Sequence, residues 1–312
     1  MAVAVSEELY APVSPGVQLC YQTFGDPDDE PLLLVMGLGG PMNWWDPRLC
    51  TMLAEAGFHV VRFDNRDTGR SSRVKGRATR RQLVQSFVGR GSRPPYTISD
   101  MAGDAFGLMD HLGWDSAHVV GVSMGGMIVQ TMAIERPSRV RSLTSIMSTL
   151  GRRTVGWQHP SLLPILLANR GAGREAYIVA SGKTWKAIGS PGYPRSDAAV
   201  RTQAEETFDR GVSARGVMRQ MLAILNQPDR SRGLGALRMP AAVVHGTADK
   251  MVHVSGGRAT ARAIPGAELL LIEGMGHDTP EELFETFTEV IRRTADRAAL
   301  GSDRSGGEPT SV

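Results

Sequence analysis

The stretch AHVVGVSMG at residues 117–125 decides the fold of this 312-residue chain. Its last five residues read G-x-S-x-G, and they separate an apolar run from a second apolar segment with helical spacing, Met127 to Ile134. A strand, a sharp turn and a helix together form a nucleophile elbow, in which a strained backbone exposes the serine Oγ at the edge of a sheet. Small residues must flank that serine, because the strand and helix backbones nearly touch there. We therefore predict that Ser123 is a nucleophile; the alternative is an ordinary strand-to-helix turn that happens to contain serine.

A nucleophilic serine needs a histidine base and a carboxylate that orients the histidine. Residues 240–246 read as a buried strand, and Asp249 follows it in a loop. Residues 268–272 read as the next strand, and His277 follows that one. Because open α/β sheets place their sites at the carboxyl ends of strands, we expect Ser123, Asp249 and His277 to meet there.

Other residues compete for these roles. Asp278 adjoins His277, but it precedes Thr279-Pro280 and is predicted to cap a helix. His245 lies at the end of a strand and is interpreted as structural, whereas His253 is close enough to Asp249 to line a pocket. Four further histidines receive no role: His59, His111, His118 and His159. None of the seven histidines has metal-ligand spacing, so no metal site is predicted.

A third component of acyl-transfer sites is a pair of backbone N–H groups that stabilise the oxyanion. The apolar run at residues 31–36 reads as a strand, and the glycine-rich segment Gly37-Leu38-Gly39-Gly40 follows it. We predict that the N–H groups of Leu38 and Met124 form the oxyanion hole, with Gly37 and Gly39 beside the substrate. A phosphate-binding loop is excluded, because the glycine spacing is wrong and no Lys-Ser/Thr follows.

Three segments together resemble a known family: LVMGLG at residues 34–39, FDNRDTGRS at 63–71 and HVVGVSMGG at 118–126. They look like the α/β-hydrolase superfamily, and within it like actinobacterial esterases grouped with aclacinomycin methylesterase and mycobacterial lipase/esterases. The resemblance spans roughly residues 10 to 296. It implies an α/β-hydrolase fold: a mostly parallel central sheet with helices on both faces and an inserted helical cap. One departure is Met36-Gly37, where the family usually has His-Gly.

The order of predicted elements agrees with that architecture. Strands alternate with helices up to about residue 148, which indicates a parallel sheet wrapped by helices. We predict a core from residues 1–148 and 236–298, a helical cap at 149–235 and a disordered tail at 299–312. In the cap, helical runs are expected at Ser161 to Leu167, Ala198 to Asp209 and Val217 to Leu225. Candidate pocket-lining residues in the cap are Trp157, Trp185 and Met221, together with Tyr177, Tyr193 and Met218.

Composition is that of an ordinary globular enzyme, with 41% apolar and 21% charged residues. The two cysteines, Cys20 and Cys50, do not indicate a disulfide framework. The amino terminus lacks the features of a secretory signal, and no apolar run is long enough to span a membrane. We therefore expect a cytoplasmic protein; its oligomeric state is left open.

Charge is unevenly distributed along the chain. Residues 150–235 contain 13 Lys/Arg and 6 Asp/Glu, against 22 and 26 in the remainder. A second basic cluster is formed by Arg73, Lys75, Arg77, Arg80 and Arg81. Such surfaces could attract anionic acyl groups, coenzyme A thioesters or anionic lipid, or could simply be solvated. Nucleic acid is not expected to bind, since no recognised motif is present and aromatic residues do not interleave with the basic ones.

These observations predict a serine hydrolase that needs no cofactor and cleaves carboxylic esters, lipid esters and thioesters included, through an acyl-enzyme. Arg66 and Asp67 are interpreted as structural residues that brace the loop beside the oxyanion strand. Related folds that use an aspartate nucleophile, the dehalogenases and epoxide hydrolases, are disfavoured by Ser123. A perhydrolase of the cofactor-free haloperoxidase type, a C–C bond hydrolase or lyase, and a non-catalytic small-ligand receptor remain as alternatives.

Overall fold

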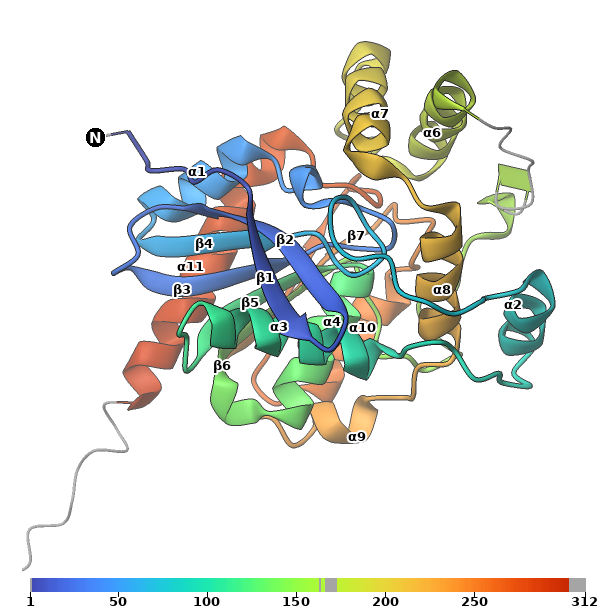
Figure 1. Ribbon diagram of the computed structural model, residues 1–312. Coiled ribbons are helices and arrows are strands. Elements are labelled where there is room, and N and C mark those ends of the chain that lie inside the picture. Colours follow the sequence, from blue (N-terminus) through green and yellow to red (C-terminus); the bar gives the residue numbers. More distant parts are fainter. Residues whose placement is uncertain (1, 163, 166–172, 303–312) are drawn as a thin grey trace, which may run out of the picture.

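A computed structural model describes residues 2–162, 164–165 and 173–302 of the chain (Figure 1). One eight-stranded sheet forms its centre, in the order β1-β2-β4-β3-β5-β6-β7-β8. Strands β3 to β8 run parallel, while β1 pairs antiparallel with β2 and β2 with β4. The strands are β1 (Leu9–Ser14), β2 (Val17–Phe24), β3 (Glu30–Val35), β4 (Phe58–Phe63), β5 (Ala117–Val122), β6 (Val140–Ile146), β7 (Ala241–Gly246) and β8 (Glu268–Ile272).

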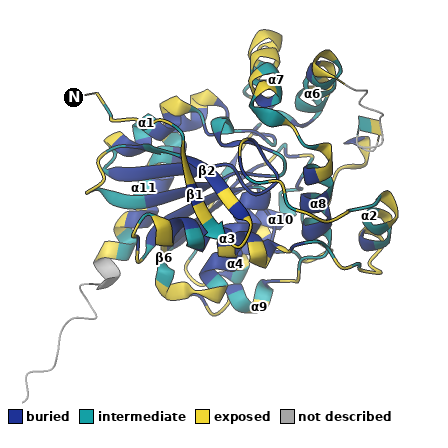
Figure 2. Ribbon diagram, viewed as in Figure 1, coloured by how far each residue is buried: buried dark blue, intermediate teal, exposed yellow. Residues whose placement is uncertain are grey.

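Helices cover both faces of the sheet, as expected for strands that are apolar on both sides. Every residue of β4, β5 and β7 is buried, and these strands lie dark in the middle of Figure 2. One face packs against α3 (Ile98–His111), α4 (Met124–Glu135) and α10 (Ser255–Ala263). The other packs against α1 (Pro47–Glu55) and α11 (Phe284–Ser302). The predicted α/β-hydrolase fold class is confirmed.

Strands stop at β6 and resume at β7, and the chain between them is helical. Its described helices are α6 (Arg174–Ile188), α7 (Asp197–Gly211), α8 (Ala214–Leu225) and the short α9 (Ser231–Leu234). The predicted helical runs at Ala198 to Asp209 and Val217 to Leu225 correspond to α7 and α8. Of the run predicted at Ser161 to Leu167, residues 163, 166 and 167 lie outside the described residues. Figure 1 shows α6 and α7 rising side by side beyond the sheet.

Three features of the chain were not among the predictions. The first two strands form an antiparallel hairpin that extends the parallel sheet. Helix α2 (Arg80–Phe87) projects from the body next to α8, within the segment where only a basic cluster was noted. Helix α11 continues to Ser302, so residues 299–302 are helical rather than part of a disordered tail. Residues 303–312 of the predicted tail lie outside the described residues.

Short one-turn helices complete the connections: η1 (Met42–Trp44), η2 (Pro137–Arg139), η3 (Pro160–Leu162) and η4 (Glu281–Leu283). Among the described residues, no helix combines the length and the apolar character that a bilayer crossing requires.

Candidate active site

Ser123 lies between β5 and α4 with backbone angles φ 56° and ψ −116°, a conformation that residues other than glycine rarely adopt. The neighbouring glycines make the turn sterically feasible. A Cβ at Gly121 would lie 2.2 Å from the carbonyl oxygen of Gly125, and one at Gly125 would lie 2.0 Å from that of Val35. The glycines therefore permit the sharp turn that the G-x-S-x-G spacing predicts.

Ser123, His277 and Asp249 form a hydrogen-bonded chain. Ser123 Oγ is 3.0 Å from His277 Nε2, and His277 Nδ1 is 2.8 Å from Asp249 Oδ2. Each residue follows the carboxyl end of a different strand, β5, β7 and β8. The two later loops contact each other, because the N–H of Ala248 donates to the carbonyl of Met275 at 3.0 Å. The three residues predicted to act together are thus adjacent in space.

Asp249 is buried, and its second carboxylate oxygen accepts the backbone N–H groups of Met251 and Val252, each at 2.8 Å. Burial alone would raise the pKa of this carboxyl. Hydrogen bonds and electrostatic interactions with His277 and His245 outweigh burial and hold the pKa of Asp249 well below its usual range. An ionised Asp249 can therefore orient the His277 ring and stabilise its protonated form at neutral pH.

The predicted oxyanion loop lies directly beside the serine. A Cβ built on Gly37 would be 3.1 Å from the Cβ of Ser123. Within the described part of the chain, neither the Leu38 N–H nor the Met124 N–H donates a hydrogen bond. Met124 is the first residue of α4, where a helix leaves its N–H groups free. Both groups are therefore available to an incoming oxygen.

Met36, which replaces the histidine common in the family, is buried among apolar side chains. Its carbonyl accepts a hydrogen bond from the Asn65 amide at 2.9 Å. Asn65 thus holds the end of β3, from which the oxyanion loop starts.

The prediction that Asp278 caps a helix is wrong. Its carboxylate is buried and accepts a hydrogen bond from the hydroxyl of Ser190, and η4 begins after Pro280 without a side-chain cap. Burial raises the pKa of Asp278 even though Ser190 opposes that shift. A tertiary contact with a residue 88 positions away therefore overrides the local Asp-Thr-Pro pattern.

His245, which the sequence predicts to be structural, lies inside the sheet. It is fully buried in β7, and its Nε2 lies 2.8 Å from the carbonyl oxygen of Val252. The same nitrogen is 3.5 Å from Asp249 Oδ2, so His245 also supports the acidic residue. His253 stacks on Trp157, with ring centroids 4.2 Å apart.

Two residues that the sequence did not single out connect the helical segment to the active-site loops. Gln220 of α8 is fully buried; its Oε1 accepts the Gly39 N–H at 2.8 Å, and its Nε2 donates to the Arg66 carbonyl at 2.8 Å. Ser190 accepts the N–H of Gly276, one residue before His277. One signal in the sequence could have identified Gln220. It is a polar side chain on the face of α8 that also carries Gly216 and Ala223, which are both buried.

The His277 loop receives a further contact from the end of α6. The backbone N–H of His277 donates to the Ile188 carbonyl at 2.7 Å, and Gly192 donates to Gly274 at 2.9 Å. The helical segment therefore contacts the loop of the predicted base as well as the oxyanion loop.

Residues 64–71 accept several of the contacts that the helical segment makes with the core. Arg219 of α8 pairs with Asp67 at 2.6 Å, and Arg210 of α7 pairs with Asp64 at 2.8 Å, with all four side chains nearly buried. Arg66 pairs with Asp104 of α3 at 2.5 Å. Burial alone would raise the pKa of Asp67, but Arg219 and Tyr96 hold it below its usual range.

The proposed lining residues lie on different sides of the site. Trp185 packs edge-to-face on Trp44, with centroids 5.1 Å apart, and Trp44 borders Gly40 of the oxyanion loop. Met221 follows Gln220 on α8 and is half-buried. Trp157 is 43% exposed and lies on the Asp249 side, through its stacking on His253.

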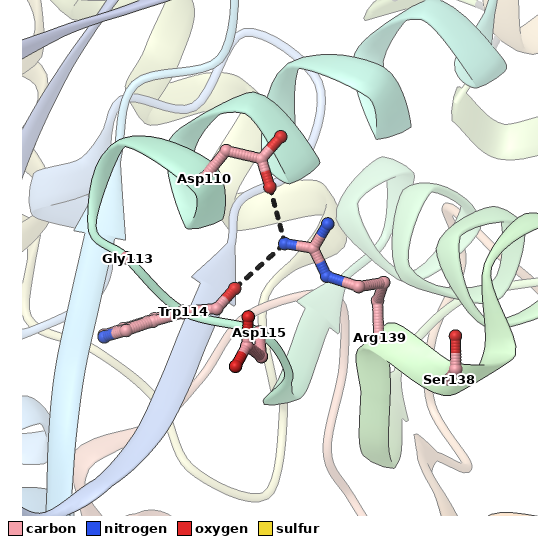
Figure 3. Close-up of a pocket in the computed structure, with 6 residues that line it drawn as sticks. All are labelled: Asp110, Gly113, Trp114, Asp115, Ser138 and Arg139. Atoms are coloured by element: carbon pink, nitrogen blue, oxygen red, sulfur yellow. Dashed lines mark hydrogen bonds and ion pairs between the residues drawn. The ribbon is translucent and has the colours of Figure 1, made fainter.

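A separate cavity of about 420 Å³ lies at the opposite end of the sheet (Figure 3). It is bordered by Asp110, Trp114 and Arg139, and Figure 3 shows Arg139 reaching both the Asp110 carboxylate and the Trp114 carbonyl. These residues precede β5 and β6, whereas Ser123 follows the other end of β5. The cavity therefore has no contact with the hydrogen-bonded chain.

The described residues contain no group of three or more His, Cys, Asp or Glu side chains arranged to hold a metal ion.

Residues 30–182 match a family model described as the alpha/beta hydrolase fold. The chain has the α/β-hydrolase fold. It is 29% identical to rhodomycin D methylesterase DauP of Streptomyces sp. (strain C5), over 88% of this chain and 94% of that protein. The predicted resemblance to the superfamily and to its methylesterase group is therefore confirmed.

Solved structures agree with that assignment. The enol-lactonase from Burkholderia xenovorans LB400 matches with a TM-score of 0.73 and 25% identity, over 92% of this chain and all of that one. The 2-hydroxy-6-oxo-6-phenylhexa-2,4-dienoate hydrolase from Rhodococcus sp. strain RHA1 matches with a TM-score of 0.72 and 19% identity, over 94% and 99% of the two chains. The latter similarity concerns the fold alone.

Proposed function

We propose that this α/β hydrolase cleaves carboxylic esters of small molecules through a covalent acyl-enzyme on Ser123. The observation that carries the proposal is the unbroken chain Ser123 Oγ–His277 Nε2 and His277 Nδ1–Asp249, with distances of 3.0 and 2.8 Å. This is the geometry that a nucleophile, its base and an orienting carboxylate require.

In the first half-reaction, Ser123 Oγ attacks the ester carbonyl carbon while its proton passes to His277 Nε2. The negative charge that develops on the carbonyl oxygen is stabilised by the N–H groups of Leu38 and Met124. The carbon–oxygen bond to the alcohol then breaks, and His277 gives its proton to the leaving alkoxide.

In the second half-reaction, water replaces the alcohol. His277 removes a proton from water as it attacks the acyl carbon, and the same proton returns to Ser123 Oγ when the acid leaves. The depressed pKa of Asp249 supports its role as the ion that keeps Nδ1 protonated throughout.

We propose that residues 149–235 act as a cap over this site and form one wall of the substrate pocket. The contacts of Gln220 with the oxyanion loop and of Ile188 with the His277 loop support this assignment. We expect the acyl or alcohol group to contact Trp185, which packs on Trp44, and Met221.

The ester class is supported by the relatives, since DauP is named a methylesterase and the structural neighbour from Burkholderia an enol-lactonase, whose substrate type is a cyclic ester. Both names describe hydrolysis at an ester carbonyl, which the arrangement around Ser123 can perform.

The proposal is tested by hydrolysis of a p-nitrophenyl ester series from acetyl to palmitoyl, with methyl esters and acyl-coenzyme A as further substrates. We expect saturable turnover that Ser123→Ala abolishes, while the melting temperature of the variant stays unchanged. Retained turnover in Ser123→Ala would refute the assignment. Peroxide-dependent halogenation in a carboxylic acid buffer, without ester hydrolysis, would instead favour a perhydrolase.

A further inference from the structure

A solvent-exposed apolar face on helix α2 is not used by the proposed reaction. Val84, Phe87 and Val88 are 64%, 63% and 59% exposed. Positions i, i+3 and i+4 share one side of a helix, so the three side chains form one patch. Exposed apolar patches of this kind mark surfaces that meet another apolar phase or partner.

The patch stands in the most basic part of the chain. Between Asp67 and Asp100 there are eight Lys/Arg residues and no Asp or Glu. Arg70 pairs with Glu8, and Arg73 donates to the carbonyls of Gly69 and Gly211. The remaining six make no side-chain hydrogen bond or ion pair within the described residues: Lys75, Arg77, Arg80, Arg81, Arg90 and Arg93.

Helix α2 is firmly attached to the body despite its exposed face. Thr79 and Gln82 form a capping box at its first turn. At its other end, Arg153 donates to the carbonyls of Ser86 and Phe87 at 2.6 and 2.7 Å. Asn226 at the end of α8 donates to the Ser86 hydroxyl at 2.9 Å. The patch is therefore presented by a fixed element that packs on α8 (Figure 1).

We propose that α2 and its flanking basic residues are a docking surface for an anionic phospholipid bilayer. Three exposed apolar side chains are flanked along the sequence by unpaired Lys and Arg residues. This matches the interfacial mode of membrane binding, in which apolar side chains enter the headgroup boundary and Lys/Arg contact anionic lipid. No carboxylate of this segment opposes that attraction.

Two further observations argue against the other occupants. A second copy of this chain placed symmetrically on the patch would bring its cations against identical cations. Single-stranded nucleic acid is bound by stacking on several aromatic side chains, but Phe87 is the sole exposed aromatic between Asp67 and Asp100, since Tyr96 is buried.

The docking surface on α2 is attached to α8, the helix that contacts the oxyanion loop. Val217 of α8 packs against Gly39, and Gln220 bonds to it, while the end of the same helix holds α2 through Asn226. Binding through α2 would therefore place α8 and the cap near the lipid surface.

The test is sedimentation of the full chain with vesicles of equimolar phosphatidylglycerol and phosphatidylcholine, compared with phosphatidylcholine alone. We expect binding to the anionic vesicles. This binding should weaken as the salt concentration rises above about 0.1 M, because the added ions screen the attraction between the basic residues and the anionic lipid. The double variant Val84→Ser/Phe87→Ser should lower the affinity by about tenfold or more. Arg80→Gln/Arg81→Gln should lower it on the order of thirtyfold, since each basic residue near the surface counts for about one factor of five.

Matched controls keep the result specific. Val179→Ser changes an exposed apolar residue of α6, and Arg258→Gln/Arg262→Gln changes two exposed arginines of α10; both should bind as the wild type does. All variants should keep the wild-type melting temperature and p-nitrophenyl butyrate turnover without vesicles. Failure of the wild type to bind anionic vesicles, or equal binding by the α2 variants, would overturn the proposal. So would light scattering that shows a dimer which Val84→Ser/Phe87→Ser converts to a monomer.

Discussion

The sheet core and the helical segment between β6 and β7 are stabilised in different ways. The core packs apolar side chains on both faces of the sheet, and it also buries neutral polar groups such as His118 and the ion pair Arg66–Asp104. The helical segment attaches through buried ions and amides, Arg210, Arg219 and Gln220. The proposed reacting groups thus follow strands of an apolar core, while the helical segment is held to it by directional polar contacts.

This difference separates two kinds of contribution to catalysis. Ser123, Asp249 and His277 all follow core strands, so they should carry the chemistry. The helical segment contacts the loops from which the reacting groups act, through Gln220 and Ile188, so it should tune their geometry. The following variants are ordered by the size of the expected effect.

Replacing Asp249 by asparagine removes the charge that orients the base. An amide beside His277 Nδ1 favours the wrong ring tautomer, and we expect kcat to fall on the order of 10⁴-fold with the fold intact. Asp278→Asn is the matched control, because its carboxylate contacts Ser190 and not the imidazole. Steady-state hydrolysis of one p-nitrophenyl ester measures both, and a comparable loss in the two variants would contradict the roles assigned here.

Breaking the buried pair between the two regions should cost stability more than chemistry. Arg219→Met leaves Asp67 buried without its partner cation, and we expect the free energy of unfolding to fall by about 3 kcal/mol. Arg215→Met, on the exposed side of the same helix, should change it little. Urea unfolding measures the difference; equal stability of the two variants would show that the interface is not held by this ion pair.

Gln220→Leu should act on the oxyanion loop. The loss of its bond to Gly39 loosens the loop that carries Leu38, and we expect kcat to fall roughly tenfold with KM nearly unchanged. Gln203→Leu on α7, whose amide oxygen accepts from half-buried Arg195, is the control. A rise in KM without loss of kcat would mean that Gln220 shapes the pocket rather than the oxyanion site.

As the pH is lowered, the free energy of unfolding should fall first because of His118, a buried neutral histidine of the core. The buried ion pairs that attach the helical segment should be affected only at lower pH. Burial lowers the pKa of His118 from its ordinary value of 6.5 to about 3, so below pH 6.5 the unfolded chain takes up a proton that the folded chain does not. The free energy of unfolding should therefore fall by about 1 kcal/mol between pH 7 and roughly pH 5.5.

Asp67 contributes nothing to that slope. Its folded pKa is depressed, so its stabilising effect persists above the ordinary value of 3.8 and is lost only as the pH falls through the lower folded value. His118→Gln should flatten the stability profile above pH 5, whatever its effect on absolute stability. Urea titrations at several pH values check this, and an unchanged slope would contradict a buried neutral His118.

The contrast between core and helical segment also explains what the sequence could predict. Ser123, Asp249 and His277 were found because each follows a strand with its own apolar pattern, and parallel strands bring their carboxyl ends to one edge. The loop at residues 37–40 was predicted as the oxyanion loop for the same reason, since it follows an apolar strand. These are consequences of periodicity and of chain order, which a sequence displays directly.

Contacts between distant segments could not be read in that way. Gln220 and Gly39 are 181 positions apart, and Ser190 and Asp278 are 88 apart. Nothing local marks such partners, so Asp278 was assigned to a helix cap on its neighbours alone. Similarly, helix α2 was seen as a basic cluster, because its packing against Asn226 of α8 depends on the folded arrangement.

The central claim is that Ser123 is the nucleophile of an acyl-enzyme mechanism. A fluorophosphonate probe followed by intact-mass and peptide analysis tests it most directly, because the probe phosphonylates an activated serine irrespective of the natural substrate. We predict one label, on Ser123, that disappears in Ser123→Ala and is strongly slowed in Asp249→Asn. No labelling of folded wild-type protein, or a label on another residue, would contradict the account.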